Sequence, residues 1–153
     1  MLKEFVEQKH CCFHDEAKDW KEAVRMSCEP LVADGTVVPG YADEIVACVE
    51  KNGPYIVLVP GVAMPHSTED LGSGRVKRSS ISFMKLQKPV HFDDPDPDKY
   101  ADLFFTVCAK NPDEHMKNIQ DLMNVLMNED LLAELHQIKN EDDLVALGNK
   151  YNL

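Results

Sequence analysis

The stretch YIVLVPGVAMPH, at residues 55–66, is the most informative part of the sequence for the fold. Its first part, residues 55–59, is a short apolar run rich in β-branched side chains, which predicts a buried strand. A Pro-Gly pair interrupts that strand, and a second short apolar segment leads to a Pro-His pair at residues 65–66. The residues that follow, 67–74, are small and polar. We therefore expect His66 to stand at a strand end beside a loop, where a side chain combines a fixed position with access.

Hydrophobic periodicity places helices on either side of the predicted strands. The strands are expected at residues 55–59, 80–86 and 103–108. The helices are expected to begin at Trp20, near Pro39, after Asp113, after Asn128 and after Asn140. Asp19 is a plausible cap for the first helix, which ends at Pro30 or at Gly35. Helices before and after the strands predict an α/β fold, a three-layer α/β/α sandwich with a central mixed β-sheet flanked by helices.

Length and charge limit the classes of function. The chain has 153 residues, of which 44% are hydrophobic, and this size predicts a single domain over residues 1–153, with residues 1–15 as an N-terminal extension or first helix. The formal net charge is -11. A surface this acidic repels phosphate backbones and anionic lipids, so neither nucleic acid nor a membrane surface is an expected partner.

Cysteine usage and motif searches predict neither a disulfide framework nor a cofactor. The chain has five cysteines, an odd number at irregular spacing, so they do not form the pattern of a disulfide framework. No signal-peptide core or membrane-length apolar run is present, so a reducing cytoplasm is expected. Residues 10–14, HCCFH, hold four potential zinc ligands, but structural zinc sites draw ligand pairs from separated positions, and no metal site is predicted. No Walker or dinucleotide motif appears, so no nucleotide cofactor is expected.

The six histidines are the side chains whose charge changes near neutral pH. His10 and His14 lie in a polar N-terminal segment, His91 ends a predicted strand, and His136 lies among helical residues. On spacing alone, His66 is either a hydrogen-bonded surface histidine or a functional one, and the surface interpretation is favoured. Motif context has to decide between the two.

That context resembles the mannitol/fructose type of enzyme IIA of the bacterial sugar phosphotransferase system. The family pattern is a glycine, small or apolar residues and Pro-His, as in residues 61–66, and then a strand ending in a Pro-Val-x-Phe turn, as in residues 86–92. Within the family, residues 20–23, 30–31 and 50–57 look closest to the ascorbate-type branch. The resemblance extends from about Trp20 to the last predicted helix.

The resemblance implies a phosphocarrier. In this family the Pro-His histidine, here His66, accepts a phosphoryl group from the phosphohistidine of the carrier protein HPr and donates it to a cognate IIB component. The implied sugar is ascorbate or a related sugar acid or pentitol, with contact to a membrane IIC only indirectly and a homo-oligomer as a further possibility. An alternative is a regulatory IIA-like module whose phosphorylation state controls a protein partner.

The resemblance also implies a role for His115. It lies in residues 111–116, NPDEHM, where the family often has a second histidine opening a helix. A helix N-terminus carries unpaired N–H groups and partial positive charge, which suit a transferring phosphate. The plain alternative is an ordinary first-turn histidine. The predicted catalytic residues are therefore His66 and His115.

Two departures from the family pattern concern arginines. Mannitol-type relatives often carry an arginine where this chain has Glu50, and ascorbate-type relatives often carry Pro-His-Ala-Arg where this chain has Ser67 and Thr68 after the histidine. The two hydroxyls are candidate donors to a phosphoryl group. Three later residues are candidate cations: Arg75, Lys77 and Arg78.

Overall fold

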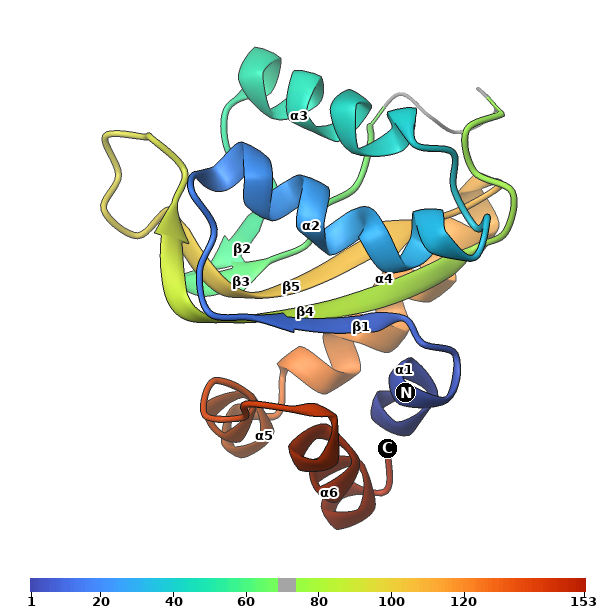
Figure 1. The fold of residues 1–153 in the computed structure, drawn as a ribbon, viewed down its shortest axis with the longest axis vertical. Coiled ribbons are helices and arrows are strands. Elements are labelled where there is room, and N and C mark those ends of the chain that lie inside the picture. Colours follow the sequence, from blue (N-terminus) through green and yellow to red (C-terminus); the bar gives the residue numbers. More distant parts are fainter. Residues whose placement is uncertain (69–73) are drawn as a thin grey trace.

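The computed structural model describes residues 1–68 and 74–153, which form a three-layer sandwich (Figure 1). Within those residues, five strands make one mixed sheet in the order β1-β4-β5-β3-β2. The strands are β1 (Cys11–His14), β2 (Val57–Val59), β3 (Gly61–Ala63), β4 (Ser80–His91) and β5 (Tyr100–Cys108). β3 runs parallel to β5, and β1 runs parallel to β4, whereas β4 and β5 are antiparallel. The predicted fold class is confirmed.

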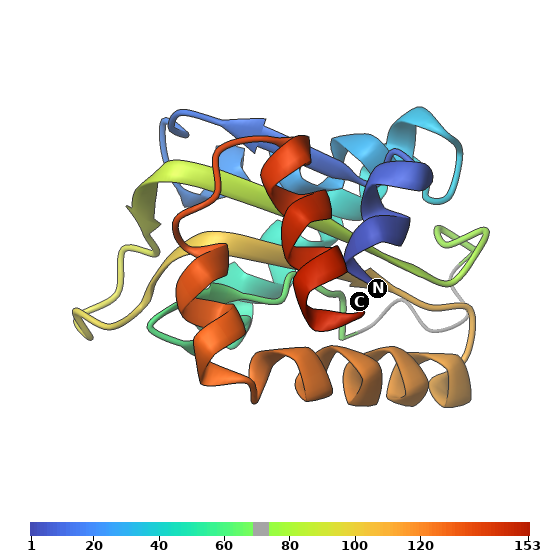
Figure 2. The ribbon, with the colours of Figure 1, turned by 90° about the horizontal axis from the view of Figure 1, so that it is seen from below.

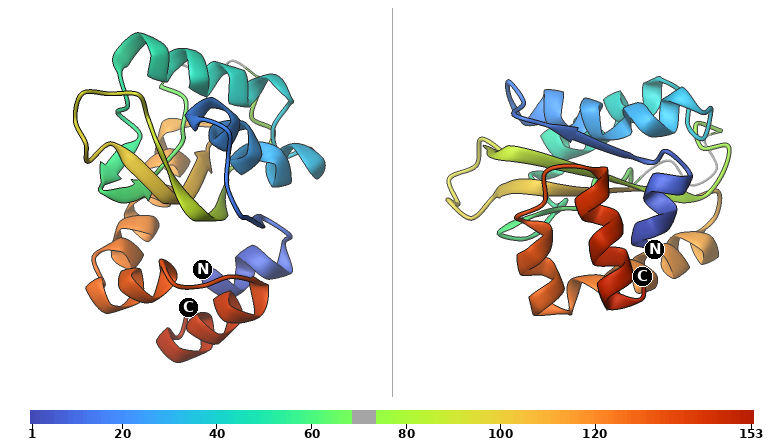
Figure 3. Two further views of the ribbon diagram at one scale, coloured as in Figure 1. Left: turned by 60° about the vertical axis from the view of Figure 1, so that its left-hand side comes forward. Right: turned by 60° about the horizontal axis from the view of Figure 1, so that its bottom comes forward.

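Helices cover both faces of the sheet. α2 (Trp20–Ala33) and α3 (Gly40–Asn52) lie on one face, and α1 (Leu2–Glu7), α4 (Pro112–Leu126), α5 (Glu129–Leu135) and α6 (Glu141–Tyr151) lie on the other (Figure 2). The left view in Figure 3 shows the same three layers from the side. Among the described residues, none of the helices has both the length and the hydrophobicity of a membrane span.

Side chains that alternate along the central strands form the core on each face. Phe83 and Phe105 point to the side of α1 and α4–α6, with ring centroids 5.3 Å apart. Phe104 points to the side of α2 and α3. All three rings are fully buried, so the period-two pattern of β4 and β5 is satisfied on both faces.

Helix α2 begins as predicted but does not end at Pro30, the first of the two residues predicted to stop it. The cap is as expected, since the Asp19 carboxylate accepts a hydrogen bond from the Glu22 N–H at 2.8 Å. The helix does not stop at Pro30 but continues to Ala33. A proline inside a helix leaves the carbonyl four residues earlier without its usual donor. Here that carbonyl belongs to Met26, and the Cys12 thiol donates to it at 3.7 Å.

Three short segments of the sheet differ from the prediction. The run at residues 55–59 is not a wholly buried strand: β2 begins at Val57, and Val59 is 46% exposed because β2 is an edge strand. β3 is a separate strand between β2 and β5. β1 was not predicted, and it makes His10 a buried residue (5% exposed) beside the sheet instead of part of a polar tail.

Candidate functional site

Parallel pairing brings the two predicted histidines to the same end of the sheet. β3 ends at Ala63, three residues before His66, and β5 ends at Cys108, shortly before α4 begins at Pro112. Since parallel strands have their carboxyl ends at one edge, the segments that follow them meet there. The backbone N–H of Val107 on β5 donates to the carbonyl of Pro65 at 2.9 Å, which joins the two segments.

The imidazole of His66 has one defined tautomer. Its Nδ1 lies 2.7 Å from the backbone carbonyl of Met64. A carbonyl oxygen only accepts hydrogen bonds, so Nδ1 carries the proton and donates it. In the neutral ring the lone pair then lies on Nε2, which is the nucleophilic atom.

His115 faces the same site from the first turn of α4. The ring centroids of His66 and His115 are 5.7 Å apart, with an angle of 40° between the planes. Asn111 caps the N-terminus of α4, because its side chain accepts a hydrogen bond from the Glu114 N–H at 2.9 Å. Both imidazoles are partly buried. The expected proximity of the two rings is therefore present in the structure.

Both imidazoles are held toward the neutral form. Burial lowers the pKa of His66 below the ordinary value of 6.5, and the neighbouring His115 lowers it further, while the hydrogen bond to Met64 acts in the opposite direction. Burial also lowers the pKa of His115. A neutral imidazole keeps a lone pair, so the site favours nucleophilic chemistry at neutral pH.

The hydroxyls that follow His66 contact helix α3. The Thr68 hydroxyl donates to the Cys48 thiol at 3.7 Å, and the Ser67 oxygen lies 4.0 Å from the same sulfur. Ser67 is buried and Thr68 is exposed. The rest of the predicted polar loop, residues 69–73, lies outside the described residues.

Sequence reasoning missed two tyrosines that contact this segment. The Tyr55 hydroxyl donates to the His66 carbonyl, and its ring meets the imidazole edge to face with centroids 5.2 Å apart. Tyr41, on α3, accepts from the Ser67 N–H at 3.4 Å. The signal available in the sequence was that a buried tyrosine hydroxyl needs a polar partner, although the sequence does not identify that partner.

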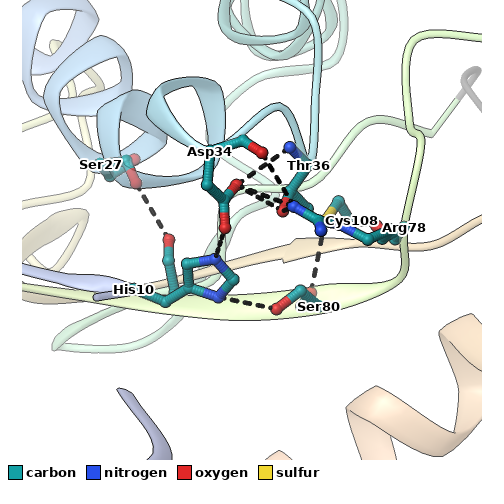
Figure 4. Close-up of polar contacts among 8 residues, drawn as sticks. His10, Ser27, Asp34, Thr36, Arg78, Ser80 and Cys108 are labelled. Atoms are coloured by element: carbon teal, nitrogen blue, oxygen red, sulfur yellow. Dashed lines mark hydrogen bonds and ion pairs between the residues drawn. The ribbon is translucent and has the colours of Figure 1, made fainter. Parts of the chain in front are cut away.

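The candidate cations have other contacts. Arg75 pairs with Glu44 on α3 at 3.3 Å. Arg78 donates to the Thr36 hydroxyl at 2.9 Å and to the Asp34 carbonyl at 3.0 Å, at the end of α2 (Figure 4). Lys77 is exposed.

Glu50, the first of the two positions at which the sequence departs from the expected family pattern, pairs with Lys21 at 3.3 Å.

His10 belongs to the cluster that holds Arg78. Its Nε2 lies 2.6 Å from the Asp34 carboxylate, and its Nδ1 lies 3.0 Å from the Ser80 hydroxyl (Figure 4). Burial raises the pKa of the neighbouring Cys11 and Cys12 thiols to about 12, which favours the protonated form of both. In residues 1–68 and 74–153, no three His, Cys, Asp or Glu side chains are arranged to hold a metal ion.

The three-layer sandwich has the fold of the enzyme IIA class of phosphotransferase-system proteins. The family model described as "Phosphoenolpyruvate-dependent sugar phosphotransferase system, EIIA 2" matches residues 4–150. The chain belongs to this family, whose members are phosphotransferase-system proteins that transfer phosphoryl groups.

Individual relatives agree with that assignment. The ascorbate-specific PTS system EIIA component of Escherichia coli K12 is 33% identical over 150 residues, which cover 96% of this chain and 94% of the relative. The mannitol-specific cryptic phosphotransferase enzyme IIA CmtB of Escherichia coli has a TM-score of 0.81 at 29% identity and covers 95% of this chain and 96% of its own. The Escherichia coli mannitol enzyme IIA, solved in complex with phosphorylated IIB, has a TM-score of 0.76 at 27% identity, with 91% and 93% covered.

Proposed function

We propose that this chain accepts a phosphoryl group on Nε2 of His66 from phospho-HPr and passes it to a cognate IIB component of an ascorbate-type system. The observation that carries the proposal is the bond from Nδ1–H to the Met64 carbonyl, which leaves the Nε2 lone pair for attack, next to His115. The sugar class rests on the ascorbate-specific relatives.

The transfer is an in-line exchange of one P–N bond for another. The Nε2 lone pair of His66 forms the new P–N bond as the P–N bond to the donor histidine breaks, and the electron pair of that bond returns to the donor nitrogen. The Nδ1 proton stays on His66, held by Met64, so the phosphorylated ring is an imidazolium. A ring in that form is a good leaving group, which keeps the phosphoryl group ready for the IIB component.

His115 makes no covalent bond in this scheme. Its imidazole, in the first turn of α4, would donate to phosphoryl oxygens while the group is in transit, and the positive end of the helix dipole would add to that stabilisation. The lowered pKa of His115 fits a neutral ring that donates from one nitrogen. The role of partner for IIB is supported by the mannitol relative solved with phosphorylated IIB.

Phosphate mapping tests the acceptor. Incubation with enzyme I, HPr and phosphoenolpyruvate should place an acid-labile phosphate on the wild-type chain and none on His66→Ala. The matched control is His91→Ala, because His91 is exposed and its ring forms hydrogen bonds with the β4–β5 loop at Asp93 and Asp96. Labelling that survives His66→Ala would show that another residue is the acceptor.

Single-turnover transfer tests the second histidine. His115→Ala should still become phosphorylated but should pass the group on about a hundredfold more slowly, because one preorganised donor is lost. Transfer would be followed from labelled HPr to the variant and then to an ascorbate-type IIB, with a mannitol-type IIB as the comparison. A wild-type rate in both steps would make His115 a bystander.

A further inference from the structure

Two peptide planes flank His66, and both are held by side chains or strands that the proposed chemistry does not otherwise use. The plane before it, between Pro65 and His66, is fixed to β5 because the Val107 N–H donates to the Pro65 carbonyl at 2.9 Å. The plane after it contains the His66 carbonyl and the Ser67 N–H. These two groups point in opposite directions from one rigid unit, since the peptide bond is planar and trans.

A tyrosine hydroxyl meets each side of that second plane. The Tyr55 hydroxyl donates to the His66 carbonyl at 2.5 Å. On the other side, the Ser67 N–H donates to the Tyr41 hydroxyl at 3.4 Å. Tyr41 in turn donates to the Val107 carbonyl at 2.8 Å. Since Val107 also holds the Pro65 carbonyl, one residue of β5 anchors both planes.

The ring of Tyr55 adds a second restraint on the imidazole. It lies edge to face against His66, with centroids 5.2 Å apart and planes at 89°. The bond from Nδ1 to Met64 fixes the rotation of the same imidazole. With the flanking planes fixed, the backbone torsions of His66 are fixed, and with these two ring contacts its side-chain torsions are fixed as well.

We propose that Tyr55 is a positioning residue for phosphoryl transfer, whose hydroxyl holds the His66–Ser67 peptide plane and whose ring edge holds the imidazole, so that Nε2 points along the line of attack. This inference rests on the proposed function of His66. Transfer of a phosphoryl group depends on alignment of the attacking atom with the bond that breaks, so a nucleophile that can swing loses rate without losing its donor.

The test is Tyr55→Phe, which removes the hydroxyl and keeps the ring. Single-turnover phosphorylation at varied phospho-HPr concentration should show the saturating rate reduced by about tenfold, with the half-saturating concentration unchanged. Tyr55→Leu, which also removes the ring edge, should lose more. The control is Tyr151→Phe on α6, whose hydroxyl bonds Glu134, and which should keep the wild-type rate.

A spectroscopic readout needs no phosphate donor. In the wild-type chain, the ¹⁵N spectrum of His66 should show a protonated Nδ1 and a bare Nε2. In Tyr55→Phe the two signals should move toward each other, because an imidazole that can leave the Met64 carbonyl exchanges its proton between the two nitrogens. An unchanged saturating rate together with an unchanged spectrum would overturn the role of Tyr55. A wild-type chain that accepts no phosphate, or accepts it elsewhere than on His66, would instead overturn the proposed function.

Discussion

At the scale of single residues, the surroundings of His66 determine the protonation state of its imidazole. Burial, supported by His115, lowers its pKa below 6.5. Attack requires the neutral ring, so the midpoint of the fall in the rate of phosphoryl acceptance on acidification should lie below pH 6.5. A rate profile from single-turnover experiments at a series of pH values would check this. A rate that already falls on acidification from pH 8 to 7 would contradict it.

The proximity of the two imidazoles also predicts how the pKa of His66 responds when His115 is replaced. In His115→Ala the neighbouring imidazole disappears, and with it both part of the burial of His66 and the Coulombic repulsion that arises when the two rings are protonated, so the pKa of His66 should rise toward the ordinary value. The Cε1 proton of His66, followed by NMR during titration, should show the midpoint at a higher pH than in the wild type. His91→Ala should leave the midpoint in place.

Gly61, the first residue of the family motif, has a structural cause that the sequence does not show. Its φ is +92°, and a Cβ there would lie 2.9 Å from Cε1 of His136. Gly61→Ala should therefore lower the free energy of unfolding by about 2–4 kcal/mol, through backbone strain and overpacking. Gly35→Ala, at φ +78° with nothing within 4 Å, should lose only about 1–2 kcal/mol of strain. Equal losses in urea unfolding would remove the packing argument.

His136 approaches Gly61 closely because a buried charge pair holds it. Its Nδ1 lies 2.8 Å from the Asp102 carboxylate, which also lies 3.2 Å from the Lys85 ammonium. Lys85 is 2% exposed and Asp102 is 7% exposed. Buried charges of this kind are kept because each has a partner. The cluster explains why His136 is fixed in place, which its position among helical residues did not indicate.

At the scale of elements, the helices were more predictable than the strands. Apolar spacing indicated α2 through α6 because that signal is local, and Asp19, Asn128 and Asn140 cap as their sequence context predicts. The cap predicted at Asp113 is wrong: Asn111 caps α4, which begins at Pro112 and includes Asp113 in its first turn. β1 and β3 were missed because strands of four and three residues carry too little periodicity to recognise. Their existence depends on pairing with β4 and β5, which is long-range information.

The α2 cap offers a test at this scale. Asp19→Ala removes the acceptor for the Glu22 N–H and should cost about 1 kcal/mol of unfolding free energy. Asp19→Asn keeps a side-chain oxygen in place and should be nearly neutral. The midpoints of urea unfolding would separate the two variants, and equal midpoints would mean that the carboxylate charge, or nothing at this position, carries the stabilisation.

At the scale of the whole molecule, one sheet joins the hydrophobic clusters of its two faces. Trp20, the only tryptophan of the chain, lies on the face of α2 and stacks on Phe92. Leu122 on α4 is fully buried on the opposite face. Leu122→Ala should lower stability by about 2–5 kcal/mol. Because the sheet is shared, tryptophan fluorescence should report the full shift, with the same urea midpoint as far-UV circular dichroism. Separate midpoints would indicate faces that unfold independently.

The site, like the sheet, could be predicted from the sequence only where the signal is local in the chain. His66 and His115 were predicted from short motifs that resemble a family pattern, and parallel pairing of β3 with β5 explains why segments so far apart in the chain meet. The contacts of Tyr41 and Tyr55 with the backbone around His66 depend on how α3 and the turn before β2 pack, which no local pattern records. Arg75 and Arg78 were candidates for the missing cations on composition alone, and their partners Glu44 and Asp34 could be known only from the fold.

The edges of the sheet have a consequence for how the chain behaves at high concentration. The outermost strands are β1 and β2, with four and three residues. An exposed strand edge offers free N–H and C=O groups to a second chain, and long flat edges promote aggregation. Edges this short present few such groups, and the long strands β4 and β5 pair with each other at the centre of the sheet. Together with a net charge of -11, which makes neighbouring copies repel one another, this arrangement favours solubility in a crowded solution.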